Sequence, residues 1–131
     1  MSNARTLIAT ACKSTTPEHA SIRLYDTERF LPYGGPLSGH LLTVVRIAFN
    51  RDDRLILSVS KDRTWCLFER TESGLQYVFD YSMLIYHAGG YTLRRTAKAH
   101  ARIIWDCAWM HEEDVFITAG RDKQASFCGQ G

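Results

Sequence analysis

Two sets of three side chains recur in this sequence at the same spacing. Each set is a histidine, a hydroxyl 18 residues later and a carboxylate four residues after that: His40, Ser58, Asp62 and His100, Thr118, Asp122. Histidine, hydroxyl and carboxylate groups can perform nucleophilic or general acid–base catalysis. Catalytic groups must converge in one pocket, however, whereas a set that recurs with the chain belongs to two copies of one unit. The repetition therefore favours a structural role for all six residues.

Other catalytic and metal-binding patterns are absent from the sequence. No serine nucleophile elbow, phosphate-binding loop or zinc-protease helix occurs. Cys107 and His111 are four residues apart, but no Cys-x-x-Cys accompanies them, and structural zinc requires four converging ligands. We therefore predict that the protein is not an enzyme and has no cofactor and no metal site.

Composition indicates an ordinary globular chain. Its 131 residues are 45% hydrophobic and 23% charged, with a net charge of +2, which is too small to indicate a nucleic-acid or membrane partner by itself. No apolar run is long enough to span a membrane, and no secretory signal is visible, so we expect no membrane partner. The four cysteines, which we interpret as buried, reduced thiols, are Cys12, Cys66, Cys107 and Cys128.

The secondary-structure elements that position these side chains are all predicted to be β-strands. Short runs of β-branched and aromatic residues, bounded by turn residues, cover 7–11, 21–25, 44–49, 55–59, 64–68, 77–86, 91–96, 103–109, 115–119 and 124–127. Gly89-Gly90 predicts a hairpin turn between the strands 77–86 and 91–96. Within the strand 44–49, we expect Val44, Ile47 and Phe49 to contact the core. No helix is predicted.

The sequence repeats itself after sixty residues. Residues 40–68 align with 100–128 without a gap, and 7–11 aligns with 55–59 as the tail of an earlier unit. The connection from Phe68 to His100 carries about seventeen extra residues. Without them the period is roughly 43 residues, which is typical of WD40 propeller blades.

The order of residues within the repeat also resembles the WD40 family. Gly39-His40, a strand ending in Ala48-Phe49, Ser58 and then Asp62 follow its pattern. The resemblance implies that His, Ser/Thr, Asp and Trp side chains form a hydrogen-bonded network in each blade. The Trp position holds Phe68, Cys128 or Tyr25; because Phe and Cys lack an indole N–H, we expect truncated networks in which the Asp–His bond survives.

The fold that this resemblance implies is all-β, a partial WD40 propeller of two to three blades in an incomplete ring. Residues 1–30 would be the tail of one blade, 37–98 a full blade with an insertion at 70–98, and 99–131 a truncated next blade. A blade buries its faces only against its neighbours. We therefore expect the isolated chain to be a fragment or truncated product that aggregates, swaps strands or remains loosely folded.

Four stretches are more specific than the generic repeat. Residues 9–13, 18–20, 60–65 and 102–105 are similar to the second-subunit family of the Elongator complex, near the end of its second propeller. The likeness weakens across 70–98 and is lost after Phe127. It implies a non-catalytic scaffold in the cytoplasm and nucleus. This scaffold would hold the largest and the catalytic subunits of a complex that modifies wobble uridines of transfer RNA. The alternative is a generic WD40 adaptor.

Some residues have two interpretations as contact sites. Trp65 and Trp105 are either buried against a neighbouring blade or exposed as anchors for a partner. The basic residues Arg94, Arg95, Lys98 and Arg102 either contact phosphates of transfer RNA or protect an exposed strand edge by charge. The aromatic segment 77–86 either pairs within its own blade or forms a partner surface.

Overall fold

The computed structural model describes the chain except residues 72–73, 79–82, 88, 112–113 and 130–131. All regular structure in the described part is β-strand, apart from one short 3-10 turn, η1 (Pro17–His19), between the first two strands. The expectation of an all-β fold is therefore confirmed.

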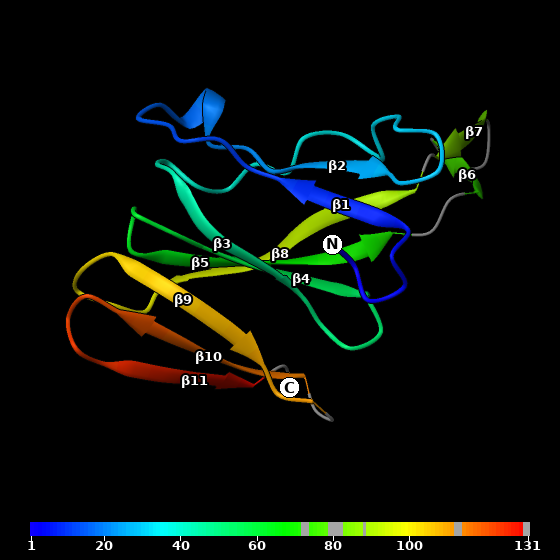
Figure 1. Cartoon of the computed structure of the whole chain (residues 1–131). Helices are drawn as coiled ribbons and strands as arrows, with labels where there is room; N and C mark the ends of the chain where they lie inside the picture. Colours follow the sequence, from blue (N-terminus) through cyan, green and yellow to red (C-terminus); the bar gives the residue numbers. More distant parts are fainter. Residues whose placement is uncertain (72–73, 79–82, 88, 112–113, 130–131) are drawn as a thin grey trace.

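Three antiparallel sheets lie side by side and a separate hairpin projects from one edge (Figure 1). The first sheet pairs β1 (Leu7–Thr10) with β2 (Arg23–Asp26). The central sheet has the order β3 (Val44–Phe49), β4 (Leu55–Ser60), β5 (Thr64–Thr71), β8 (Gly90–Lys98). The third sheet joins β9 (Ile104–Trp109), β10 (Val115–Gly120) and β11 (Ala125–Gly129), and the hairpin joins β6 (Gly74–Val78) to β7 (Met83–His87).

Two predictions about the insertion were wrong. The run 77–86 is not one strand, because β6 and β7 pair with each other from Gly74↔His87 to Val78↔Met83. Gly89-Gly90 does not close a hairpin either, since β8 pairs with β5 in a register that begins at Thr71↔Gly90. Strand propensity marks residues that suit a sheet but does not specify their partner. The long β5 edge provides that partner for β8. Residues 79–82, which fell inside the predicted strand, lie outside the described residues.

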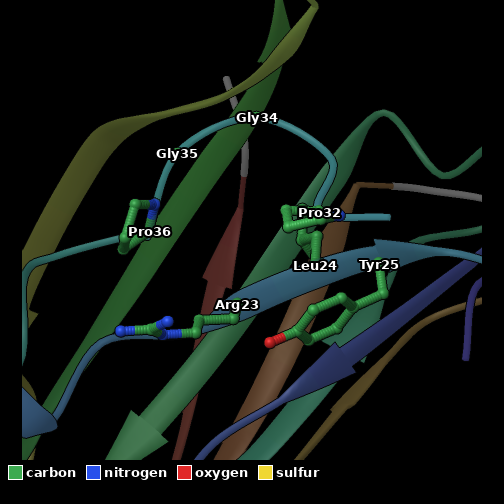
Figure 2. Close-up of a pocket in the computed structure, with 7 residues that line it drawn as sticks. All are labelled: Arg23, Leu24, Tyr25, Pro32, Gly34, Gly35 and Pro36. Atoms are coloured by element: carbon green, nitrogen blue, oxygen red, sulfur yellow. The ribbon is translucent and has the colours of Figure 1, made fainter. Parts of the chain in front are cut away.

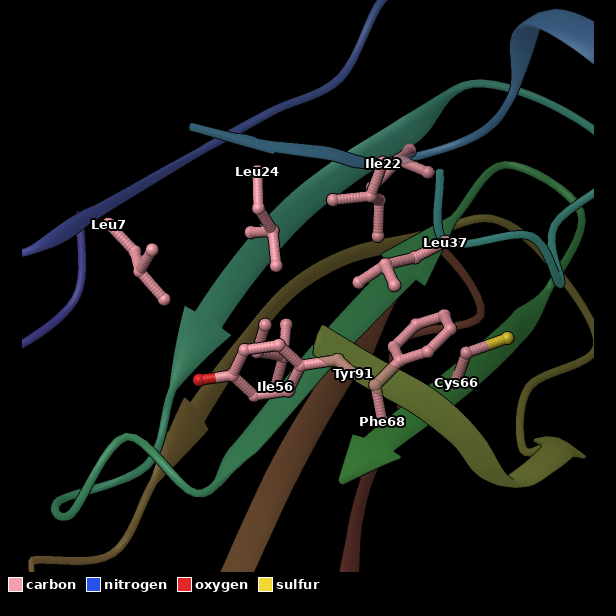
Figure 3. Packing of buried hydrophobic residues seen from close by; sticks show 9 residues of the cluster. Leu7, Ile22, Leu24, Leu37, Ile56, Cys66, Phe68 and Tyr91 are labelled. Carbon is pink, nitrogen blue, oxygen red and sulfur yellow. The ribbon is translucent and has the colours of Figure 1, made fainter. Parts of the chain in front are cut away.

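One hydrophobic core fills the space between the first sheet and the central sheet. Figure 3 shows Leu7 and Leu24 from the first sheet facing Ile56 and Tyr91 from the central one. Val44 is buried here, and Ile47 and Phe49 are half-buried against the same cluster, so their predicted core contacts are confirmed. The other members are Ile22, Leu37, Cys66 and Phe68.

A second core fills the space between the central and third sheets. Its members are Leu55, Leu57, Val59, Trp65, Leu67, Ile104, Cys107 and Phe116. Trp65 and Phe116 meet edge to face with their ring centroids 5.0 Å apart, an arrangement that aromatic pairs prefer. Strand β4 is buried along its whole length because it contributes to both cores. Leu55-Ile56-Leu57 is accordingly apolar at every position rather than at alternate ones.

Polar contacts also link the central and third sheets, between equivalent positions of the repeat. Arg46 Nε lies 2.8 Å from Asp106 Oδ1, and Arg54 donates to Asp114 over 2.7 Å. The buried Asn50 amide donates to the same Asp114 carboxylate over 2.9 Å. Each arginine precedes its aspartate by sixty residues, the length of the repeat. Opposite charges at equivalent positions of the repeat mark these contacts in the sequence, although the contacts were not predicted from it.

The four cysteines differ in solvent exposure more than predicted. No disulfide joins these four cysteines, all of which lie among the described residues; Cys66 and Cys107 are buried, Cys128 is partly buried, and Cys12 is exposed. The prediction of a buried thiol was therefore wrong for Cys12, which lies in the polar segment after β1, outside both cores. Burial raises the pKa of the Cys107 thiol to about 12.

Exposure should decide which cysteines react with a thiol reagent. A thiol-specific maleimide applied to the folded protein should modify Cys12 quickly and leave Cys66 and Cys107 unmodified, because the thiolate is the reactive form and both buried thiols are shielded. Mass spectrometry of peptides before and after denaturation measures this. Rapid native labelling of Cys107 would contradict the packing of the second core.

Candidate functional site

The first histidine network lies at the end of the central sheet where the turn between β4 and β5 meets the segment before β3. His40 Nδ1 lies 3.1 Å from Asp62 Oδ2, and its Nε2 lies 2.6 Å from Ser58 Oγ. Asp62 also accepts from the Leu41 backbone N–H at 2.9 Å and from the Thr64 backbone N–H at 2.9 Å. The network therefore ties two segments that are distant in sequence to the buried strand β4.

The two ionisable side chains of this network, His40 and Asp62, are both buried. Burial of the His40 ring opposes its protonation, but its hydrogen bonds, first that with Asp62, outweigh burial and raise its pKa to about 9. The pKa of Asp62 is lowered: burial opposes its ionisation, and the bonds from His40, Thr64 and Leu41 overcome that effect. With this pKa, His40 is an imidazolium near neutral pH and donates from Nδ1 to Asp62 and from Nε2 to Ser58.

The second network repeats this geometry in the third sheet. His100 Nδ1 lies 3.1 Å from Asp122, and its Nε2 lies 2.8 Å from Thr118 Oγ1. The pKa of Asp122 is lowered because the bonds from His100 and backbone N–H groups exceed the effect of desolvation. A Cβ at Gly120 would lie 2.7 Å from His100 Nδ1, so glycine leaves the room that the histidine ring needs. The Asp122 side chain is 13% exposed, compared with 5% for Asp62.

The two networks belong to different sheets and do not form one pocket. The His40 ring is 1% exposed and the His100 ring is fully covered, so neither imidazole can meet a substrate from solvent. Phe68, at the position where the family has tryptophan, is buried in the first core and provides no donor. The hydrogen bonds of each network can fix strands and turns relative to one another. The histidine, hydroxyl and aspartate side chains therefore have a structural role here.

The two tryptophans that were candidate contact sites, Trp65 and Trp105, have opposite environments. Trp65 is 4% exposed and packs against Phe116 and Ile104 of the third sheet, so the alternative of a partner anchor at Trp65 is wrong. It lies on the face of β5 that the neighbouring sheet covers. Trp105 at the start of β9 is 48% exposed and remains a candidate contact residue.

The four basic residues 94, 95, 98 and 102 do not form one cluster. Arg94 is paired with Glu69 on β5, and the Arg95 guanidinium lies over the Trp65 ring at 5.6 Å from its centroid. Lys98 and Arg102 instead lie at the connection from β8 to β9, and both are exposed. The structure therefore separates two arginines that have partners on the sheet from two cations at its end.

The hollow in Figure 2 is too small to serve as a ligand site. It lies between β2, which contributes Arg23 and Tyr25, and the loop that carries Pro32 and Pro36. Its volume of about 80 Å³ is far below that of a typical small-molecule pocket.

Neither a metal centre nor a membrane span is found in the part of the chain that the structure describes. No three His, Cys, Asp or Glu side chains gather there as a metal site. Cys107 is buried on β9 and His111 is exposed after it. None of the described helical structure has the length and apolar character to cross a membrane.

Two parts of the chain match a known repeat family, and nearly the whole chain matches known proteins. The family model "WD domain, G-beta repeat" matches residues 33–69 and 91–127, which together are more than half of the chain. Elongator complex protein 2 of Schizosaccharomyces pombe is 44% identical over 97% of this chain, and that of Saccharomyces cerevisiae is 37% identical over 89%. Elongator complex protein 2 of Homo sapiens is 33% identical over 98%. The chain spans about 15% of the length of these relatives. With stacked antiparallel sheets in an open array and two matched repeats, the chain belongs to the WD40-repeat family and resembles one section of Elongator complex protein 2.

Proposed function

We propose that this chain is a non-catalytic scaffold section that helps to hold the subunits of an Elongator-type complex together. The observation that carries the proposal is the combination of two buried inter-sheet cores with His–Asp networks closed to solvent. Such an array presents loops and edges rigidly, and it offers no reactive group within the networks. The similarity to Elongator complex protein 2 along nearly the whole chain supports the choice of complex.

The partners we propose are the largest and the catalytic subunits of that complex, in the cytoplasm and nucleus. The modification of wobble uridines in transfer RNA would then be performed by the catalytic partner. The contribution of this chain would be geometric, because a few well-placed contacts on a rigid surface provide most of the affinity of an interface. Trp105 is a candidate for one such contact, since it is a large aromatic that remains exposed.

Affinity purification of the full-length protein that carries these residues tests the proposal. We expect the largest and catalytic subunits to co-purify in stoichiometric amounts, whereas an unrelated WD40 protein with the same tag should retain neither. Recovery of other proteins in place of these two subunits would favour a generic WD40 adaptor and overturn the choice of complex.

The second candidate function is direct contact with transfer RNA through the region 94–102. The exposed cations Lys98 and Arg102 support it, because neutralised phosphates contribute affinity that falls with salt. Arg94 and Arg95 support it less, since Glu69 and the Trp65 ring already engage them.

A further inference from the structure

Three turns converge at one end of the central and third sheets, on the left in Figure 1. They connect β4 to β5, β8 to β9 and β10 to β11. A hollow of about 330 Å³ lies among them, lined by Arg63, Arg102 and Arg121 together with Ala101 and Ile103. Each arginine comes from a different turn, so only the packing of the two sheets brings the three guanidinium groups around one space.

A second hollow adjoins the first and shares Arg63 with it. Its volume is about 440 Å³, and its lining also includes Lys61, Lys98, Leu41 and Leu42. The described residues that line the first hollow include no acidic residue. Asp62 lines the second hollow. Its carboxylate is 5% exposed and accepts hydrogen bonds from His40 and backbone N–H groups, so it neutralises little of the surrounding positive charge.

The five cations of this surface have no carboxylate partner among the residues that the structure describes. Arg46, Arg54 and Arg94, by contrast, form ion pairs on the sheets. Like charges that line a common hollow repel one another, and a bound anion relieves that repulsion. We call this surface the turn-end basic surface; its members are Lys61, Arg63, Lys98, Arg102 and Arg121.

We propose that the turn-end basic surface binds the phosphate backbone of an RNA strand. Guanidinium groups match phosphate oxygens in a two-point geometry, and adjoining hollows that share Arg63 suit successive phosphates rather than a single anion. None of the described residues that line either hollow is aromatic, so bases are not stacked there and binding is independent of sequence. An acidic peptide fits less well, because the surface consists of turns and offers no strand edge for main-chain pairing.

This inference deepens the second candidate function and rests on it for the choice of RNA. It replaces Arg94 and Arg95 by Arg63 and Arg121 as the contact residues, because the former pair already has partners on the sheet. It is independent of the scaffold role, which co-purification tests separately.

The test compares two triple variants of the full-length protein with equal changes in charge. The first is Arg63→Gly, Arg102→Gln, Arg121→Gln; glycine suits position 63 because Arg63 has a φ of 73°. The control is Arg23→Gln, Arg29→Gln, Arg51→Gln, which removes three exposed arginines outside the turn-end basic surface.

The probe is a labelled single-stranded RNA of about 20 nucleotides, longer than common single-strand site sizes. Binding is titrated between about 50 and 200 mM salt. Thermal unfolding of each variant checks that it is folded.

We expect the first variant to bind RNA at least about tenfold more weakly and to lose about 2 units from the slope of log K against log salt concentration. The control should bind as the parent does. Equal losses in both variants would overturn the proposal. If RNA binding survives the first variant but is lost on Arg94→Gln with Arg95→Gln, the RNA candidate stands and this surface is wrong. No RNA binding by the parent rejects both.

A polyglutamate peptide of equal charge provides the second arm of the experiment. Tighter binding of this peptide than of RNA, with the same dependence on the three arginines, would assign the surface to acidic protein segments and overturn the choice of RNA. If the triple variant does not fold, the single variants Arg102→Gln and Arg121→Gln replace it. Both residues are exposed, and we expect a loss of about threefold to fivefold in each, since each removes about one phosphate contact.

Discussion

Replacing Trp65 with alanine should reduce the free energy of unfolding of the central and third sheets by about 3–5 kcal/mol, the usual cost of deleting a large buried aromatic. The indole is 4% exposed and fills the second core against Phe116. Removing it leaves a cavity and takes away the ring over which the Arg95 guanidinium lies. Hydrogen exchange of the β9 and β10 amides in the full-length protein measures the effect, because those strands lose their packing surface.

Trp105→Ala is the matched control for this change. It removes the same side chain from a position that is 48% exposed, so protection of β9 and β10 should change little. A Trp65→Ala variant with parental exchange rates but weakened partner binding would contradict the core assignment and return Trp65 to the interaction surface.

Replacing Asp62 with asparagine should destabilise the central sheet by about 2–4 kcal/mol, because it leaves a buried histidine without its counter-charge. Asp62 is the common acceptor for His40, the Leu41 N–H and Thr64. Urea unfolding of the full-length protein, followed through exchange of β4 and β5 amides, measures the loss. Asp122→Asn is the internal control and should have the smaller effect, since Asp122 is more exposed than Asp62.

The same network makes stability depend on pH in a defined direction. The folded pKa of His40, about 9, exceeds its ordinary value of 6.5, so its contribution is complete below pH 6.5 and is lost as pH rises through about 9. The lowered pKa of Asp62 gives a contribution that is present above its ordinary value of 3.8 and lost as pH falls below it. Stability of β4 and β5 should therefore decrease between pH 6.5 and about 9, and Asp62→Asn should flatten that decrease. An unchanged slope in the variant would show that another group is responsible.

Much of the local structure could be predicted from the sequence because it depends on neighbours in the chain. Strand β3 begins and ends at the predicted residues 44 and 49, since apolar residues there are bounded by clear turn residues. The insertion was predicted less well: its aromatic run predicted one strand where two occur, and Gly89-Gly90 predicted a hairpin that does not form. Both errors concern which strand pairs with which.

Some features of the candidate site could likewise be predicted from the sequence, and others could not. Spacing alone indicated that His40 and Asp62 belong to one repeated unit, and the structure places the ring and the carboxylate 3.1 Å apart. Spacing could not show that Arg94 pairs with Glu69 whereas Lys98 and Arg102 have no carboxylate partner in the described part of the chain. These differences arise from strands that pair across twenty or more residues.

The sequence by itself determined the repeat, its strand class and the family pattern, because these depend on residue order within a few turns and strands. Only the tertiary structure decided the burial of Trp65, the partner of β8 and the gathering of Arg63, Arg102 and Arg121 around one hollow. Those features depend on how one sheet lies against the next. That arrangement is set by packing of apolar faces and pairing of strand edges that are distant along the chain.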